Sequence, residues 1–339
     1  MKAWLRRLLG KKARTAWISH PIFLQHEPGN GHPEAAGRIT AIETELQQQS
    51  IWPRLRGVQA EEASDKQLAL VHASRYLNFL ESMRPQPGKI YRLDDDTVMS
   101  HDSLTIARYG AGAVIKAVDR VMAEKSHNAF CAVRPPGHHA QSDKAGGFCL
   151  INNVAVGAMH AVAAHRLQRI AIIDFDVHHG NGTEEVFKDD PRILFLNSCE
   201  NDLYPFPGDI PAGKNPNMVN LPFSPHTGSI EFREQVRRQW LPRLSRFKPE
   251  LVLLSAGFDA HRDDEIGRLS LHEADYAWLT HKIMQAAGEC PGRIISVLEG
   301  GYQLDSLAKS TAAHLYVLTG MGKPPCAVEY DAYLKTLKP

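Results

Sequence analysis

The stretch at residues 170–182, IAIIDFDVHHGNG, changes within a few positions from an apolar run to carboxylates, imidazoles and glycines. Residues 170–175 are rich in β-branched side chains and do not alternate, which is typical of a strand covered on both faces of a parallel sheet. Because side chains alternate along a strand, Asp174, Asp176 and His178 should leave one face as the strand ends. Open α/β sheets bind ligands at that edge.

Two carboxylates at a buried strand end indicate a metal site. Burying charged groups is costly unless a proton or a cation neutralises them, and Asp with His suits a borderline-soft divalent ion. The alternative is that Asp174 and Asp176 cap the next helix and that the histidines belong to a surface loop.

Apolar runs alternate with helical patterns along the whole chain. The expected strands are residues 15–19, 129–133, 170–175, 193–196, 251–255 and 294–298. The expected helices are residues 38–49, 103–124, 153–165, 229–247 and 271–287. Strands separated by helices predict an α/β fold with a mostly parallel, multi-stranded sheet that is flanked by helices on both faces. With no repeat or long linker, we expect one domain at residues 15–339 after a basic extension at residues 1–14.

Polar clusters follow four of these runs: RPPGHH after Val133, DVHHGNG after Phe175, AGFDAHRDD after Ser255 and EGGY after Leu298. The carboxyl ends of parallel strands meet at one edge of a sheet, so the four loops should converge. Their convergence predicts an active site.

Composition narrows the possible partners. The formal net charge of the 339 residues is +1, so neither nucleic acid nor an anionic membrane is expected as the main partner. No apolar stretch approaches the roughly 20 residues of a transmembrane helix, and the apolar group near the N-terminus is too short for a signal peptide. Five cysteines without CxxC spacing indicate free thiols in a reducing compartment, so we expect a cytoplasmic protein.

The ordered motifs resemble those of the zinc-dependent histone deacetylase family, more closely its class II and bacterial members, including acetylpolyamine amidohydrolases, than class I. The resemblance runs from about His20 to Gly320. It rests on HPEAAGR at 32–38, RPPGHH at 134–139, GGFCLINN at 146–153, DFDVHHGNGT at 174–183, AGFDAHRDD at 256–264 and EGGY at 299–302. It implies a single-domain arginase/deacetylase fold and hydrolysis of an acetylated amine.

The resemblance also implies the metal ligands. Asp176, His178 and Asp259 would hold one Zn²⁺, although Asp and His also serve Fe²⁺. Asp174 would lie behind the ligands and help to hold a structural K⁺. Residues 197–200 depart from the family's Ser-x-His pattern, which leaves the details of that K⁺ site open.

The family's catalytic groups match residues on two of the loops. His139 would be the general base that takes a proton from the attacking water, with His138 as its electrostatic partner and Asp174 setting the tautomer of His138. Asn181 stands where class I members carry Asp, so His139 is less strongly paired. The hydroxyl of Tyr302 would stabilise the oxyanion.

A substrate channel and a product exit are implied as well. Phe148 and Phe206 would form the aromatic walls of the channel, and Gly147 would admit the substrate chain. Asp96 would accept substrate N–H groups at the rim of the channel. Arg38 would line an exit path for acetate.

We expect the substrate to be an acetylated lysine of a peptide or protein, or an acetylated polyamine. Polyamine-specific relatives carry an acidic gatekeeper, and the alignment on Asp259 puts Ile266 there, which favours acetyl-lysine. A dimanganese ureohydrolase is a weaker alternative, because RPPGHH and EGGY have no role in its chemistry. A binding module for acetylated ligands is another, although His139 and Tyr302 together argue against it. The sequence does not indicate an oligomeric state.

Overall fold

A parallel sheet forms the centre of the protein. The computed structural model describes residues 15–205, 215–288 and 293–337. In this part of the chain, eight strands form a sheet in the order β2-β1-β5-β10-β9-β6-β7-β8, with every neighbouring pair parallel. The strands are β1 Thr15–Ser19, β2 Leu55–Gln59, β5 Ala129–Cys131, β6 Ile170–Asp174, β7 Ile193–Glu200, β8 Met218–Phe223, β9 Leu251–Ala256 and β10 Ile294–Leu298. A separate antiparallel pair joins β3 Ile90–Arg92 to β4 Val98–Ser100.

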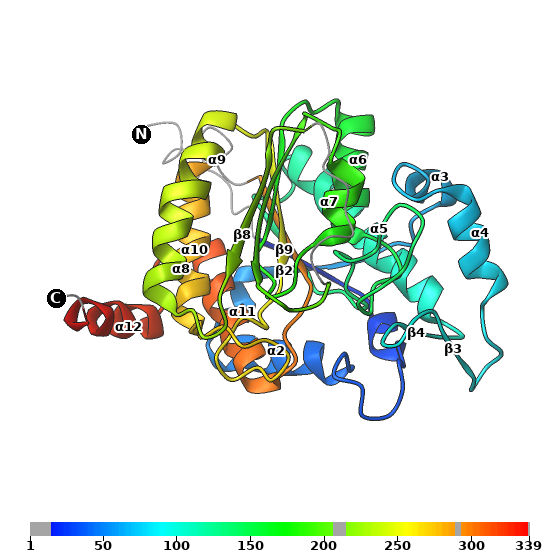
Figure 1. Cartoon of the computed structure of the whole chain (residues 1–339), viewed down its shortest axis with the longest axis horizontal. Helices are drawn as coiled ribbons and strands as arrows, with labels where there is room; N and C mark the ends of the chain where they lie inside the picture. Colours follow the sequence, from blue (N-terminus) through cyan, green and yellow to red (C-terminus); the bar gives the residue numbers. More distant parts are fainter. Residues whose placement is uncertain (1–14, 206–214, 289–292, 338–339) are drawn as a thin grey trace.

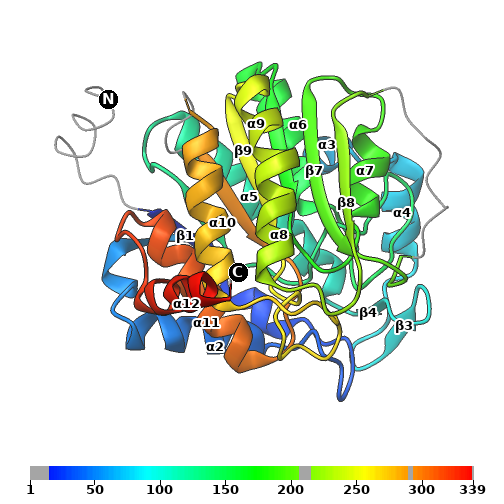
Figure 2. The same cartoon turned by 60° about the vertical axis from the view of Figure 1, so that its left-hand side comes forward.

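Helices cover both faces of this sheet. On one side lie α2, α8, α9, α10 and α11, and on the other lie α5, α6 and α7 (Figures 1 and 2). The α-helices are α2 Gly37–Gln48, α3 Asp65–Leu68, α4 Ser74–Ser82, α5 Ser103–Met122, α6 Asn153–His165, α7 Asn181–Phe187, α8 Ser229–Gln235, α9 Leu241–Phe247, α10 Glu273–Ala286, α11 Leu304–Leu318 and α12 Pro325–Thr336. Short 3₁₀ turns occupy Pro21–Gln25 and Trp52–Arg54.

Alternation along the central strands creates the two cores. In β6, Ala171 and Ile173 join the core beneath α2 and α8–α11, while Ile170 and Ile172 join the core beneath α5–α7. Phe175 continues the first set beyond the strand end. The side chains on both faces are buried, which explains why the central strands read as unbroken apolar runs.

All six expected strands and all five expected helices are present, with shifts of a few residues at their ends. The prediction of a mostly parallel α/β fold is confirmed. The expected helix at residues 229–247 includes a π-helical turn, Val236–Trp240, between α8 and α9.

The sequence analysis missed the two edge strands, β2 and β8, the β3–β4 pair, and the helices α3, α4, α7, α11 and α12. Edge strands keep polar, exposed side chains, as in LRGVQ of β2, so they lack the apolar run that marks a central strand. The basic extension predicted at residues 1–14 lies outside the described residues.

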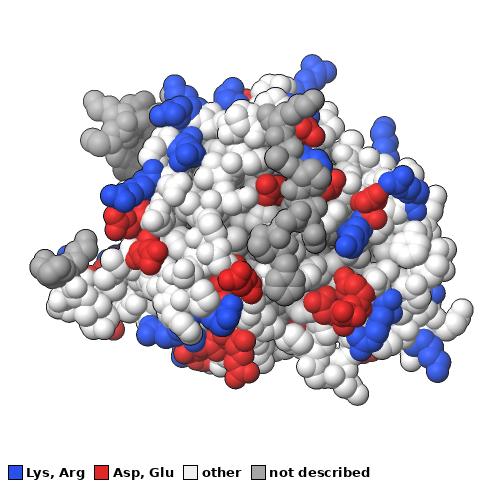
Figure 3. Space-filling model, viewed as in Figure 1, with Lys and Arg blue, Asp and Glu red and all other residues white. Residues whose placement is uncertain are grey.

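Acidic and basic side chains are interspersed on the face of the molecule that Figure 3 shows. Among the helices of the described part of the chain, none is both long and apolar enough to cross a membrane.

The central strands should dominate the stability of the fold. Leu253 of β9 is fully buried, so Leu253→Ala should lower the free energy of unfolding by about 2–5 kcal/mol. Urea denaturation measures the loss. Val328→Ala, at a side chain that is 53% exposed on α12, is the matched control and should change stability by less than about 0.5 kcal/mol. Equal losses in both variants would contradict this account of the core.

Candidate active site

The four polar loops follow β5, β10, β9 and β6, which are consecutive strands of the sheet. All four strands are parallel, so their carboxyl ends lie at one edge. The loops that carry His138 and His139, Tyr302, Asp259 and Asp176 are therefore neighbours in space as well as in the strand order.

Asp176, His178 and Asp259 form a compact group at this edge. One ligand atom from each lies within 4.8 Å of the other two, and all three residues are buried. His178 Nδ1 is 2.9 Å from Asp176 Oδ1 and 3.2 Å from Asp259 Oδ2. Backbone N–H groups hold the carboxylates in place, since Gly300 N donates to Asp176 Oδ2 over 2.8 Å and Val177 N donates to Asp259 Oδ1 over 2.9 Å.

Electrostatics show that this group favours a positive charge. Asp259 Oδ2 is buried without a hydrogen-bond partner in the described structure. Burial, and then the charge of Asp176, raises the pKa of Asp259 to about 7. Burial alone would lower the pKa of His178, but the adjacent carboxylates of Asp176 and Asp259 raise it to about 10. A bound divalent cation would neutralise both carboxylates, so the residues fit a metal ion.

Glycines make room beside the carboxylates. A side chain at Gly300 would overlap Asp259 Oδ2 and Asp176 Oδ2, and one at Gly257 would overlap Asp176. This close approach explains why EGGY and AGFD carry glycine next to the acidic groups.

His138 and His139 lie side by side above this group, with their ring centroids 4.0 Å apart. His138 Nδ1–H donates to Asp174 Oδ2 over 3.0 Å, while its Nε2 lies 3.8 Å from Asp176 Oδ2. Of the histidine pair that follows β6, His178 is buried and the side chain of His179 is only 19% exposed, and α7 has no side-chain cap from either aspartate. The alternative of helix-capping aspartates and a surface histidine loop is therefore wrong.

The two histidines have opposite protonation preferences. Burial alone would lower the pKa of His138, but Asp176 and Asp174 raise it to about 10. Burial, together with the charges of His138 and His178, lowers the pKa of His139 well below its usual value. His139 Nδ1–H donates to Asn181 Oδ1 over 2.7 Å, which leaves Nε2 as the basic nitrogen.

Glu299 positions the histidine turn and was missed by the sequence analysis. Its Oε2 accepts from Gly137 N over 2.6 Å and from His138 N over 3.2 Å, while Ser255 Oγ donates to its Oε1 over 3.3 Å. Its position as the first residue of the EGGY motif could have identified Glu299 as a site residue.

Tyr302 is the last residue of this motif and is held by contacts on two sides. The guanidinium of Arg38 lies 4.9 Å from the centre of its ring, and the Phe148 ring meets it edge-on at 5.8 Å. Asp264 Oδ2 accepts from Tyr302 N over 2.6 Å and from Gln303 N over 3.0 Å. Asp264 was missed as a site residue, although it ends the AGFDAHRDD motif.

Arg38 is buried and tied to the same loop. Its Nε donates to Gly301 O over 2.7 Å, its Nη2 donates to Glu299 O, and its Nη1 donates to Glu34 Oε1 over 3.1 Å. Burial alone would raise the pKa of Glu34, but Arg134, His26 and Arg38 lower it to about 2. These contacts show Arg38 bracing the Tyr302 loop; its role in acetate exit stays a prediction.

Gly147, Phe148 and Tyr204 surround His139 and Tyr302. Gly147 has a positive φ of 53°, and a side chain there would overlap the rings of His139 and Tyr204. Tyr204 meets His139 edge-on at 5.0 Å and was missed, although it begins the YPFPGD segment. Phe206 of the same segment lies outside the described residues, so its role as a channel wall stays a prediction.

Asp96 lies beside Phe148. Thr97 Oγ1 donates to Asp96 Oδ1 over 3.3 Å and accepts from Phe148 N over 3.1 Å. Burial and the neighbouring Asp94 raise the pKa of Asp96 to about 6. Its contact with substrate stays a prediction.

Ile266 is half-buried, and its N–H donates to Asp264 Oδ1 over 3.1 Å. The proposed gatekeeper is therefore bonded to the carboxylate that also holds the backbone of Tyr302.

Comparisons with known proteins agree with this geometry. The family model described as "Histone deacetylase domain" matches residues 32–318. The chain is 36% identical to type-2 histone deacetylase 2 of Dictyostelium discoideum over 91% of its own length, but it spans only 21% of that protein. It is 38% identical to chloroplastic histone deacetylase 14 of Arabidopsis thaliana, with 89% of this chain and 76% of that protein covered.

Polyamine deacetylase HDAC10 of Homo sapiens is 36% identical over 86% of this chain and 45% of its own length. The crystal structure of the HDA15 HD domain superposes with a TM-score of 0.85 at 31% identity, covering 93% of this chain and 92% of that one. The α/β sheet with its two helical layers is thus the arginase/deacetylase fold. From its family match, its relatives and its fold, the chain belongs to the histone deacetylase family.

Proposed function

We propose that the chain is a metal-dependent amidohydrolase that removes an acetyl or related short acyl group from a lysine side chain or a similar primary amine. The observation that carries the proposal is the buried group of Asp176, His178 and Asp259 beside two histidines of opposite protonation preference. A zinc ion held by these three residues would supply a Lewis acid next to the acyl carbonyl.

His138 and His139 have different roles in proton transfer. Neutral His139, with Nδ1–H held by Asn181, offers Nε2 to take a proton from the attacking water. The same nitrogen then returns that proton to the leaving amine. His138, held by Asp174, is placed to stabilise negative charge that develops beside it.

Tyr302 provides the matching donor. Its hydroxyl donates a hydrogen bond to the acyl oxygen as that oxygen gains charge. Asp264 and Arg38 fix the backbone and ring of this residue, so little reorganisation is needed when the substrate binds.

The surrounding aromatic groups suit an alkyl chain that ends in an amide. Phe148, Tyr204 and Gly147 can accept methylene groups, and Asp96 can accept an N–H donor at the rim. Acetylated polyamines share this chemistry and are the second candidate, because a relative is named a polyamine deacetylase. Zinc rather than iron as the native ion, and potassium near Asp174, form part of the same proposal.

Replacing the tyrosine hydroxyl tests the mechanism. Tyr302→Phe keeps the ring against Arg38 but removes the oxyanion donor, so kcat should fall about 10²–10³-fold with little change in KM. Acetate release from a matched panel of acetyl-lysine peptides and acetylpolyamines measures the effect. Tyr333→Phe, at an exposed tyrosine, is the control and should keep full activity. Undiminished turnover by Tyr302→Phe would show that the Tyr302 hydroxyl does not stabilise the oxyanion.

Replacing one ligand tests the metal. Chelation should abolish turnover, and Zn²⁺ should restore it in the wild type but not in Asp259→Asn, which loses a charged ligand. The same assay is repeated with Fe²⁺ in place of Zn²⁺ under anaerobic conditions. Asp263→Asn, at a neighbouring carboxylate whose side chain is 64% exposed, should behave as the wild type. Activity that survives complete removal of metal would show that the reaction needs no ion.

A charge at the gatekeeper position tests substrate choice. Ile266→Glu should raise the ratio of kcat/KM for acetylpolyamine over acetyl-lysine peptide about tenfold, because one close charge pair is worth roughly 1–4 kcal/mol. Ile266→Gln is a neutral control of similar size. If both variants show the wild-type ratio, Ile266 is not the gatekeeper.

A further inference from the structure

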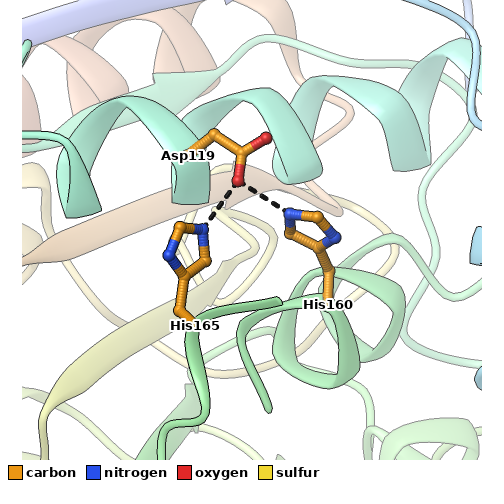
Figure 4. A group of neighbouring side chains, drawn as sticks. All are labelled: Asp119, His160 and His165. Carbon is orange, nitrogen blue, oxygen red and sulfur yellow. Dashed lines mark hydrogen bonds and ion pairs between the residues drawn. The ribbon is translucent and has the colours of Figure 1, made fainter. Parts of the chain in front are cut away.

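A second cluster of metal-ligating side chains lies away from the active-site loops. Asp119 comes from α5, and His160 and His165 come from α6 (Figure 4). Both histidines direct the same ring nitrogen at one carboxylate oxygen: Nε2 of His160 is 2.8 Å and Nε2 of His165 is 2.7 Å from Asp119 Oδ1. We propose that these three residues form a second metal site, for a zinc-type divalent cation.

The spacing of the three donors is close to that of a bound ion. All three ligand atoms lie within 4.8 Å of one another. Two ligands of a tetrahedral zinc ion at about 2.0–2.1 Å lie roughly 3.3 Å apart. The two contacts to Asp119 Oδ1 therefore need to open by only about half an ångström, which small rotations of the side chains supply.

Donor chemistry favours zinc over the harder ions. Two imidazoles and one carboxylate match the donor set of zinc sites that keep an open position. Ca²⁺ and Mg²⁺ prefer all-oxygen surroundings, and imidazole suits zinc and related transition metals. The side chains are 12%, 25% and 49% exposed for His160, His165 and Asp119, so water can complete the coordination.

The cluster is separate from the catalytic group, but the helix α6 that carries its two histidines also contacts the turn of His138 and His139. The α6 helix begins beside the histidine turn, where Asn153 Nδ2 donates to Pro135 O over 3.3 Å and Asn152 Nδ2 donates to Ala140 O over 3.1 Å. His160 comes seven residues after Asn153, or about 10 Å along the helix axis. An ion at the far end of α6 would clip it to α5 and stabilise the scaffold without contacting the substrate.

Counting bound zinc tests the proposal on the full chain. Equilibrium dialysis against a zinc series, with metal content measured by mass spectrometry, should give a tight first ion and a weaker second ion in the wild type. Asp119→Asn, His160→Gln and His165→Gln should each lose the second ion and keep the first. Loss of a ligand should weaken the second site by more than the roughly 10–100-fold that an outer-shell partner contributes. Asp259→Asn should show the reverse pattern, which separates this site from the catalytic one.

A matched control is His281→Gln, at an exposed histidine on α10, which should keep both ions. Added zinc beyond the first ion should also raise the melting temperature of the wild type and of His281→Gln, but not of His160→Gln. A single zinc ion per chain in the wild type, or a second ion that persists in all three variants, would overturn the proposal. Either result would leave the cluster as hydrogen-bonded side chains only. Because the three variants change two helices independently, poor folding of one does not prevent the decision.

Discussion

Two carboxylates that cannot both be buried without positive charge organise this protein. Asp176 and Asp259 leave adjacent parallel strands at the same edge, and Asp259 Oδ2 has no hydrogen-bond partner in the described structure. The imidazoles of His178 and His138 lie beside these carboxylates, and a bound divalent ion would neutralise the remaining charge. The neighbouring glycines, Gly257 and Gly300, serve the same end, since any side chain there would displace a carboxylate.

A second layer of contacts holds the reactive groups that face this charge. Glu299 accepts from the backbone of the histidine turn, Asp264 accepts from the backbone of Tyr302, and Arg38 donates to the carbonyls of Glu299 and Gly301. The first two contacts each join two different strand-end loops, and Arg38 ties helix α2 to the loop after β10. Because catalysis depends on groups already placed where charge develops, these braces matter as much as the residues they hold.

Sequence reasoning located the central strands and the motif residues because both signals are local. A strand buried on both faces is continuously apolar, and DVHHGNG or RPPGHH is recognisable within a few residues. It missed β2 and β8, whose exposed edges dilute the apolar pattern, and Tyr204, whose ring contact with His139 joins residues far apart in the chain. Phe206, the rim contact of Asp96 and the gatekeeper role of Ile266 stay predictions.

The sequence by itself determined the fold class, the edge at which chemistry gathers and the residue types that gather there. Periodicity and parallel topology are enough for that, since the carboxyl ends of parallel strands share one edge. Only the tertiary structure decided which groups pair. It showed that His138 is held by Asp174 while His139 is held by Asn181, and that Asp119 meets two histidines of another helix. Such pairings join residues far apart in the chain, and their distances and protonation depend on packing and burial that no local pattern encodes.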